Sequence, residues 1–185
     1  MRKSTFNVIG ISCTSLNVLL TILAFAPPYW IVSSYGRMAR LGLWARCNDI
    51  FNHGECIWSM DSRFGYQHLL PQWFKATQGL MSVGLGLALL ALIVATLALC
   101  CQCHGCNYAS TVAGLLLICF LCIGVAVALF GIKASQDFHA VVASDNFSSG
   151  QEYKYAWSFW LAAGAAGMAL ITSIIYGCAG LNTQY

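Results

Sequence analysis

Gly-Leu-Trp-Ala-Arg-Cys, at residues 42–47, belongs to the segment with the highest density of special residues in this sequence. Trp30 precedes it, and Cys56-Ile57-Trp58 follows after a gap of eight residues. Long apolar runs that are almost free of charge flank this polar segment on both sides. We therefore expect the rest of the chain to anchor the loop between Trp30 and Cys56 outside a cell.

The composition places the chain among integral membrane proteins. Of its 185 residues, 59% are hydrophobic and only 8% are charged, and the mean hydropathy is +0.70. In soluble domains about a quarter of the residues are charged. The net charge of +3 is small and the basic residues are scattered, so no nucleic-acid surface is expected.

Four segments are apolar, free of internal charge and at least as long as the roughly 20 residues that an α-helix needs to cross hydrocarbon. Backbone hydrogen bonds in lipid must be satisfied within each segment, and the ten-residue alternation of a barrel is missing. The sequence therefore predicts a membrane all-α fold, a four-helix transmembrane bundle with two larger loops. The predicted spans are residues 6–26, 76–101, 108–132 and 156–180, and the loops are residues 27–75 and 133–155.

The spans offer no chemistry for transport or catalysis. A pump, proton relay or ion path would normally need an intramembrane Asp, Glu, Lys or Arg, so the hydroxyl and amide side chains of the first span are expected to pack between helices. The sequence also has no nucleophile–base pair and no phosphate-binding loop. We expect neither an enzyme nor a bound cofactor or metal ion.

The first span has a competing interpretation as a cleavable signal peptide. Arg2-Lys3 precedes the apolar run, and Ala24-Phe25-Ala26 resembles a cleavage site. The run is longer than usual for such a peptide, and Pro27-Pro28 follows directly, so we favour a membrane anchor. Tyr29 and Trp30 come next, and their amphipathic rings suit the lipid headgroup interface.

The sidedness of the loops depends on two opposing arguments. The positive-inside rule weakly favours an inside location for the larger loops, because they carry most of the Lys and Arg residues. A cysteine pair in a polar loop favours an oxidising compartment, and Asn146-Phe147-Ser148 is an N-glycosylation sequon. We therefore predict a multi-pass plasma-membrane protein with both loops outside, a glycan at Asn146 and both termini in the cytosol.

The first loop has the pattern of a small β-sheet. Short runs of branched and aromatic residues lie at 29–32, 41–44 and 56–58, and turn-forming residues lie between the last two runs. The pattern predicts a hairpin whose arms are joined by a disulfide between Cys47 and Cys56. Closing a ring of about ten residues should stabilise the loop by roughly 2.5–3 kcal/mol.

These residues resemble a known signature. Trp30, then Gly42, Leu43 and Trp44, then Cys47 and Cys56 at their spacing are similar to the tryptophan, Gly-Leu-Trp and cysteine signature of the claudin superfamily. This superfamily includes claudins, peripheral myelin proteins, epithelial membrane proteins and calcium-channel γ subunits. The resemblance implies a single claudin-like tetraspan domain over residues 1–185. It also implies that both loops form one small extracellular antiparallel β-sheet on a left-handed helix bundle.

The resemblance implies two alternative functions. In the first, the chain is a divergent claudin-like cell–cell junction and adhesion protein, which forms or regulates a paracellular barrier and associates with its own copies in cis and in trans. In the second, it is an auxiliary γ-like subunit of an ion channel or receptor. Residues 155–162 resemble the epithelial membrane and peripheral myelin group, and Lys75-Ala76 replaces the Arg-Ala of many claudins. Glu55 and Asp61 are either pore-lining charges or a solvated rim.

Two further motifs lie on the predicted cytosolic side. A cysteine-rich turn between the second and third spans favours S-palmitoylation, with inert thiols or a zinc site as alternatives. Its cysteines are Cys100, Cys101, Cys103 and Cys106. At the chain end, Thr183 and Tyr185 loosely fit a PDZ ligand, whereas a disordered stub is the simpler interpretation.

Small residues recur four positions apart in three of the spans. This spacing allows close helix contact, either inside the bundle or between neighbouring copies. The pairs are Ser82/Gly86, Gly84/Ala88, Gly124/Ala128 and Ala163/Gly167.

Overall fold

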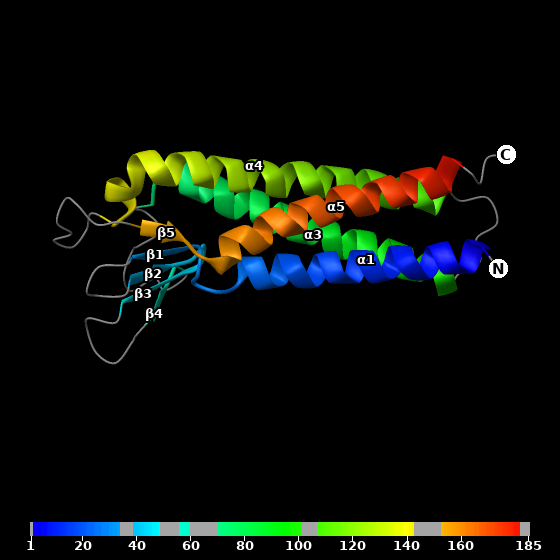
Figure 1. Cartoon of the computed structure of the whole chain (residues 1–185), viewed down its shortest axis with the longest axis horizontal. Coiled ribbons are helices and arrows are strands. Elements are labelled where there is room, and N and C mark those ends of the chain that lie inside the picture. The colour runs from blue at the N-terminus through cyan, green and yellow to red at the C-terminus, as the bar shows by residue number, and fades with distance from the viewer. Residues whose placement is uncertain are drawn as a thin grey trace.

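The computed structural model describes residues 2–33, 39–48, 56–59, 70–100, 107–142 and 153–181. Four long helices run side by side, a small sheet lies at one end of them, and both termini lie at the other end (Figure 1). All four helices are long and apolar enough to cross a membrane, which confirms the predicted tetraspan fold. The helices are α1 (Arg2–Phe25), α3 (Gln72–Cys100), α4 (Tyr108–Val142) and α5 (Trp157–Leu181).

Helix α1 is a full member of the bundle, because it packs against both α3 and α5. Its polar residues Thr14, Asn17 and Thr21 are fully buried. The hydroxyl of Thr14 donates to the Gly10 carbonyl and that of Thr21 to the Asn17 carbonyl, each at 2.8 Å. These side chains therefore lie in the interior of the bundle, and both hydroxyls are satisfied within the helix.

Two helices extend beyond the predicted spans on the side of the sheet. Helix α3 begins at Gln72, and the amide of Phe74 donates to the Pro71 carbonyl at 3.0 Å in its first turn. Helix α4 continues to Val142, which is within the predicted loop. Hydropathy marks where the membrane ends and not where a helix ends. The stretch after Ile132 becomes polar, but it contains no Pro or Gly until Gly150.

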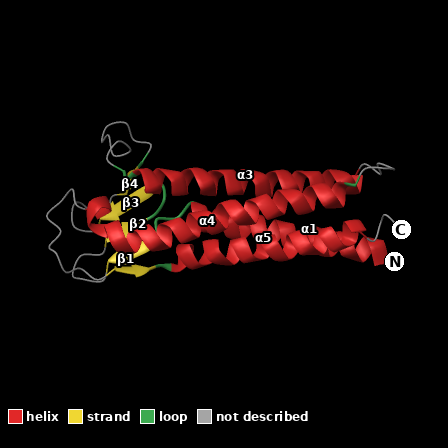
Figure 2. Ribbon diagram, turned by 90° about the horizontal axis from the view of Figure 1, so that it is seen from above, coloured by secondary structure: helices red, strands yellow, loops and turns green. Residues whose placement is uncertain are grey.

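Within the described residues the sheet has five strands in the order β4-β3-β2-β1-β5, and every neighbouring pair is antiparallel (Figures 1 and 2). Strand β5 comes from the second loop and pairs with β1, so both loops contribute to one sheet. This confirms the fold class that the resemblance implied. The strands are β1 (Ile31–Ser33), β2 (Ala39–Leu41), β3 (Ala45–Asn48), β4 (Cys56–Trp58) and β5 (Tyr153–Tyr155).

The prediction of one β run over residues 41–44 is wrong, because the chain reverses there. Strand β2 ends at Leu41 and β3 begins at Ala45, while the amide of Gly42 donates to the Ala45 carbonyl at 2.9 Å. Leu43 and Trp44 form the turn between the two strands. Turns are usually polar because they face water, whereas Leu43 is buried. This apolar turn is buried against the helix bundle.

The small residues of α3 lie on two different surfaces of the helix. A Cβ added at Gly84 would lie 2.6 Å from Cγ1 of Ile123, and Ala88 is fully buried, so this pair allows α3 and α4 to pack closely. Ser82 and Gly86 are exposed on the outside of the bundle. No atom lies within 4 Å of a Cβ added at Gly86. The packing interpretation therefore applies to Gly84/Ala88.

Candidate functional site: the junction of sheet and bundle

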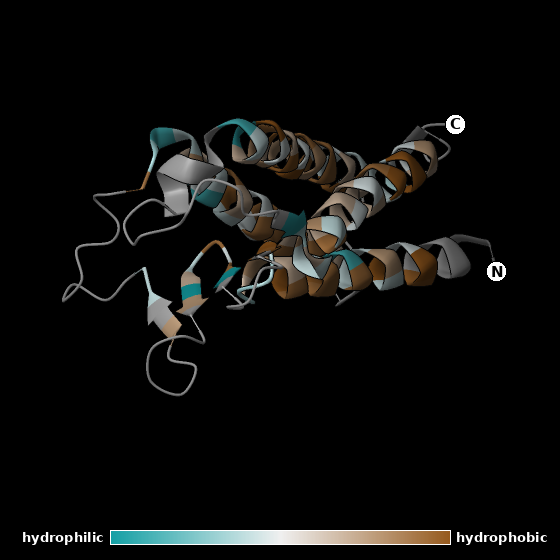
Figure 3. Cartoon of the chain, turned by 60° about the vertical axis from the view of Figure 1, so that its left-hand side comes forward, coloured by the Kyte–Doolittle hydropathy of each residue, from teal (hydrophilic) through white to brown (hydrophobic). Residues whose placement is uncertain are grey.

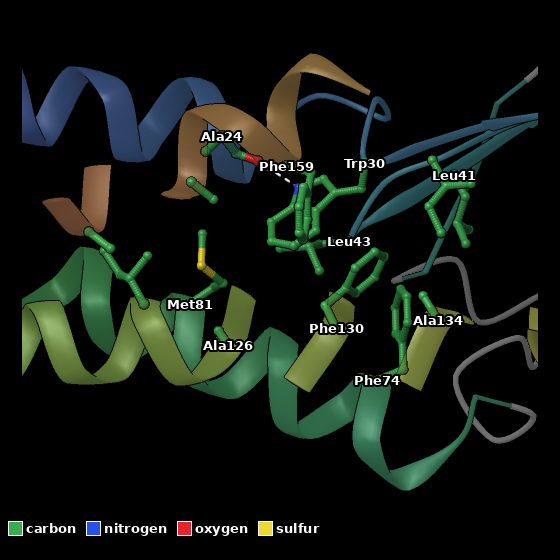
Figure 4. Packing of buried hydrophobic residues seen from close by; sticks show 14 of the residues in the cluster. Ala24, Trp30, Leu41, Leu43, Phe74, Met81, Ala126, Phe130, Ala134 and Phe159 are labelled. Atoms are coloured by element: carbon green, nitrogen blue, oxygen red, sulfur yellow. Dashed lines mark hydrogen bonds between the residues drawn. The ribbon is translucent and has the colours of Figure 1, made fainter. Parts of the chain in front are cut away.

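Trp30 lies at the centre of the junction between the sheet and the helices. Its ring is fully buried and meets Phe130 and Phe159 edge to face, with centroid distances of 4.7 and 5.9 Å (Figure 4). Aromatic pairs in this geometry are stabilising beyond the area that they bury. The interfacial interpretation of Trp30 is therefore wrong, because α4 and α5 enclose the ring on the inside of the protein.

Trp30 also caps the first helix. Its indole Nε1 donates to the Ala24 carbonyl at 2.8 Å. The last carbonyls of a helix have no partner within the helix, so a buried donor at this position satisfies one of them. The backbone of Trp30 joins two more segments, since its amide donates to the Leu41 carbonyl and its carbonyl accepts from the Ala156 amide, both at 2.9 Å. One residue thus connects α1, the sheet and the start of α5.

Gly42 allows the turn between β2 and β3 to approach the end of α1. A Cβ at this position would lie 2.4 Å from Cα of Pro28 and 2.7 Å from the Pro27 carbonyl oxygen. Both neighbours are backbone atoms and cannot rotate away. Only glycine fits where two backbone segments come this close, which explains the glycine of the Gly-Leu-Trp motif.

Leu43 and Trp44 attach the same turn to the helices. The Leu43 carbonyl accepts a hydrogen bond of 2.6 Å from Nε2 of Gln78, a buried residue of α3. The ring of Trp44 packs on Phe25, the last residue of α1, with a centroid distance of 5.3 Å. Sequence reasoning missed Gln78, although a glutamine near the start of an otherwise apolar span is a signal for a specific buried contact.

The disulfide between Cys47 and Cys56 forms as predicted. It joins β3 to the outer strand β4, where the two cysteines lie directly opposite each other in the register. Cys47 is buried and Cys56 is exposed. A three-residue strand at the end of a sheet has few hydrogen bonds of its own, so this crosslink contributes to holding β4 in place.

The strand from the second loop is fixed by a tyrosine that sequence reasoning did not single out. The hydroxyl of Tyr155 donates to the Gly131 carbonyl of α4 at 2.7 Å. Its ring stacks on Phe159 of α5 with a centroid distance of 4.5 Å. Tyr155 therefore ties β5 to two helices, and Phe159 is shared between Tyr155 and Trp30.

Several predicted site residues lie outside the residues that the structure describes, or have side chains that it does not describe. Cys100 is the last residue of α3, and only its backbone is described. The others lie in the connecting segments and at the chain end. They are Glu55, Asp61, Cys101, Cys103, Cys106, Asn146 and Tyr185.

The geometry defines a class of membrane protein: four spans that carry one antiparallel sheet, built from both loops and fixed by a buried tryptophan, a glycine-dependent turn and a disulfide. The model of the PMP-22/EMP/MP20/Claudin family matches residues 5–176, and the chain belongs to this family. No curated protein matches the chain individually. The residues of the signature therefore have a structural role that fits this family, because they hold the sheet on the bundle.

Proposed function

We propose that this protein acts at cell–cell junctions, where it forms or regulates a paracellular barrier through its sheet. The observation that carries this proposal is the attachment of the sheet to the bundle. Three features fix the position of the sheet relative to the spans. They are the buried Trp30 ring, the close approach of the turn at Gly42 to the end of α1, and the hydrogen bond from Gln78 to the Leu43 carbonyl. A sheet held in this way presents a defined surface, which suits repeated association between copies better than a flexible loop would.

The proposed orientation places the sheet outside the cell. The sheet lies at one end of the spans, and many of the hydrophilic residues lie near this end, whereas the helices are coloured mostly as hydrophobic (Figure 3). The disulfide supports an oxidising environment for this end. Both termini lie at the opposite end and would be cytosolic (Figure 1).

This orientation makes two modifications testable. Asn146 would then carry a glycan, and enzymatic deglycosylation would shift the gel mobility of the wild type but not that of Asn146→Gln. Cys100 ends α3 at the end of the bundle away from the sheet, and Cys101, Cys103 and Cys106 follow it in the sequence, so all four are proposed as palmitoylation sites. Replacing all four by serine would then abolish acyl exchange labelling.

The junction role is tested by contact enrichment in mixed cultures of expressing and non-expressing cells. We expect the protein to concentrate where two expressing cells meet and not where an expressing cell meets a non-expressing one. Cys56→Ser removes the disulfide and should abolish this enrichment. Cys178→Ser is the matched control, because Cys178 is a free, exposed cysteine of α5 and its loss leaves the sheet intact. Uniform surface staining of the wild type would contradict the proposal.

A second candidate is the auxiliary subunit of an ion channel or receptor. The sequon at Asn146 favours it, because a glycan on the second loop would oppose head-on contact between cells. The test is affinity purification from native membranes under mild detergent. Recovery with a pore-forming subunit would support this role, whereas a species that contains only copies of this chain would support the junction role. The predicted charges Glu55 and Asp61 and the PDZ contact at Tyr185 are relevant to either role and stay predictions.

A further inference from the structure

A basic and aromatic patch lies on the outside of the protein, where the sheet meets the spans. Its members are Arg40 of β2, Lys154 of β5, Tyr29 after α1, and Trp157 and Trp160 of α5. Neither the junction role nor the auxiliary-subunit role uses these five side chains together. We propose that this patch binds the phosphate group of an anionic phospholipid in the leaflet on the side of the sheet.

The aromatic residues locate the patch at the membrane boundary. The apolar stretch of α5 begins at Trp157, and Trp157 and Trp160 are 45% and 64% exposed on the outside of the bundle. They lie three positions apart, so they project from neighbouring places on the helix surface. Tryptophan concentrates at the lipid headgroup level, where one part of the ring meets hydrocarbon and the indole N–H meets polar groups.

Arg40 is connected to Trp157 through the ring of Tyr29. The ring of Tyr29 packs against that of Trp157 with a centroid distance of 5.5 Å. Cζ of Arg40 lies 5.3 Å from the Tyr29 ring centroid, and its Nη1 donates to the Tyr29 hydroxyl at 2.8 Å. The headgroup layer extends about 5–7 Å beyond the hydrocarbon on each side. These contacts link the guanidinium to the tryptophan at the start of the apolar stretch, and under the proposal it lies within the headgroup layer.

The sheet register adds a second cation on the same face. Val32 lies opposite Lys154 on one side and opposite Arg40 on the other. Residues directly opposite each other project from the same face, so Lys154 and Arg40 flank Val32. Two strand spacings separate their backbones by about 10 Å, and Lys154 is exposed. Arg46 projects from the other face, since it follows Ala45 and precedes Cys47, the residue opposite Arg40.

The chemistry of this set suits a phosphate diester. A guanidinium has five N–H donors in a planar fork that matches phosphate oxygens, so Arg40 can contact a phosphate while it keeps its bond to Tyr29. The Tyr29 hydroxyl accepts that bond and retains its own hydrogen as a donor. Lys154 supplies a flexible second charge, which favours a lipid of net negative charge over a zwitterionic one.

The test is native mass spectrometry of the delipidated protein in detergent, titrated with phosphatidylglycerol or phosphatidylcholine. We expect the wild type to retain phosphatidylglycerol preferentially. Arg40→Gln and Lys154→Gln should each weaken its binding about fivefold, and the double variant should lose the preference. Arg46→Gln is the matched control, because it removes one positive charge from the opposite face and should leave the preference unchanged.

Three results would overturn the proposal. The first is an unchanged preference in the double variant, and the second is an equal loss in Arg46→Gln, which would indicate an effect of net charge alone. The third is displacement of the lipid by excess inorganic phosphate, which would indicate an anion site without a lipid partner. Lys154→Gln carries the test if Arg40→Gln does not fold, because Lys154 is exposed. Retention of the disulfide on non-reducing gels monitors the fold of each variant.

Discussion

The junction between sheet and bundle and the middle of the bundle are both closely packed, but they depend on different kinds of residue. In the middle, alanines account for many of the fully buried positions, including Ala88, Ala91, Ala162, Ala165 and Ala169. At the junction, Trp30, Gly42 and Gln78 each make a contact that a residue of a different size or polarity could not make. The comparison shows that close helix packing in this protein depends on small side chains, whereas the placement of the sheet depends on contacts specific to individual residues.

Replacing Trp30 by alanine should break the junction most severely. The substitution empties the space between Phe130 and Phe159 and leaves the Ala24 carbonyl without its buried donor. Loss of a buried Trp side chain costs about 3–5 kcal/mol. Thermal unfolding in detergent should show a large loss of stability. Trp160→Ala, at an exposed position, should unfold near the wild-type temperature; equal losses would contradict the distinction between the two sites.

Gly42→Ala should have the next largest effect. The added methyl group would meet the backbone of Pro27 and Pro28, and relieving the overlap requires the turn to move away from α1. We expect a loss of about 3 kcal/mol and reduced yield of folded protein. Gly86→Ala adds the same methyl group where no atom lies within 4 Å and should cost nothing measurable. A tolerated Gly42→Ala would show that the junction is more adaptable than the contacts imply.

Gln78→Leu tests, within the single helix α3, whether a contact to the sheet matters more than a bond inside the helix. It keeps the size of the side chain but removes the 2.6 Å bond to the Leu43 carbonyl, at a cost of about 1–3 kcal/mol for a buried acceptor without a partner. Ser82→Ala lies one turn further along α3 and removes a bond within the helix, from its hydroxyl to the Gln78 carbonyl. In parallel unfolding measurements, Gln78→Leu should be the more destabilising of the two.

Tyr155→Phe should have the smallest effect of the four. The ring keeps its stacking on Phe159, and the hydroxyl bond to the Gly131 carbonyl is lost. The expected cost is about 0.5–1.5 kcal/mol. Hydrogen exchange of the β1 and β5 amides is the most direct measurement, because faster exchange should be confined to this pair. An equal change in β3 would show that the sheet responds as one unit.

The sequence predicted the bundle well because a membrane span is a local property. An uncharged run of about 20 residues is visible without knowing its neighbours, and all four predicted runs are helical. The Cys47–Cys56 hairpin was also predictable, since its two arms are close in the sequence. The end of α4 was not, because residues 133–142 leave the apolar pattern while they stay helical.

The details of the junction were less predictable because its contacts join distant segments. From the sequence alone, Trp30 suits the lipid interface. Its interior position is visible only from its contacts with Phe130 and Phe159, which are distant in the sequence. Residues 41–44 have the composition of a strand, and the turn there is stabilised by the burial of Leu43 and by the bond from Gln78, which is distant in the sequence. The Gly-Leu-Trp motif indicated which residues matter, whereas the physical reason for each came from its partners in space.

The pairing of β1 with β5 has a consequence for biosynthesis. Strand β1 follows the first span and β5 precedes the last, so the sheet joins segments that leave the ribosome far apart in time. Strand β5 (Tyr153–Tyr155) pairs with one edge of β1. Until β5 is synthesised, it cannot cover this edge. Completion of the sheet therefore requires synthesis to have passed the third span, α4. A chain stopped before residue 153 would expose an unpaired strand edge, a feature that promotes aggregation.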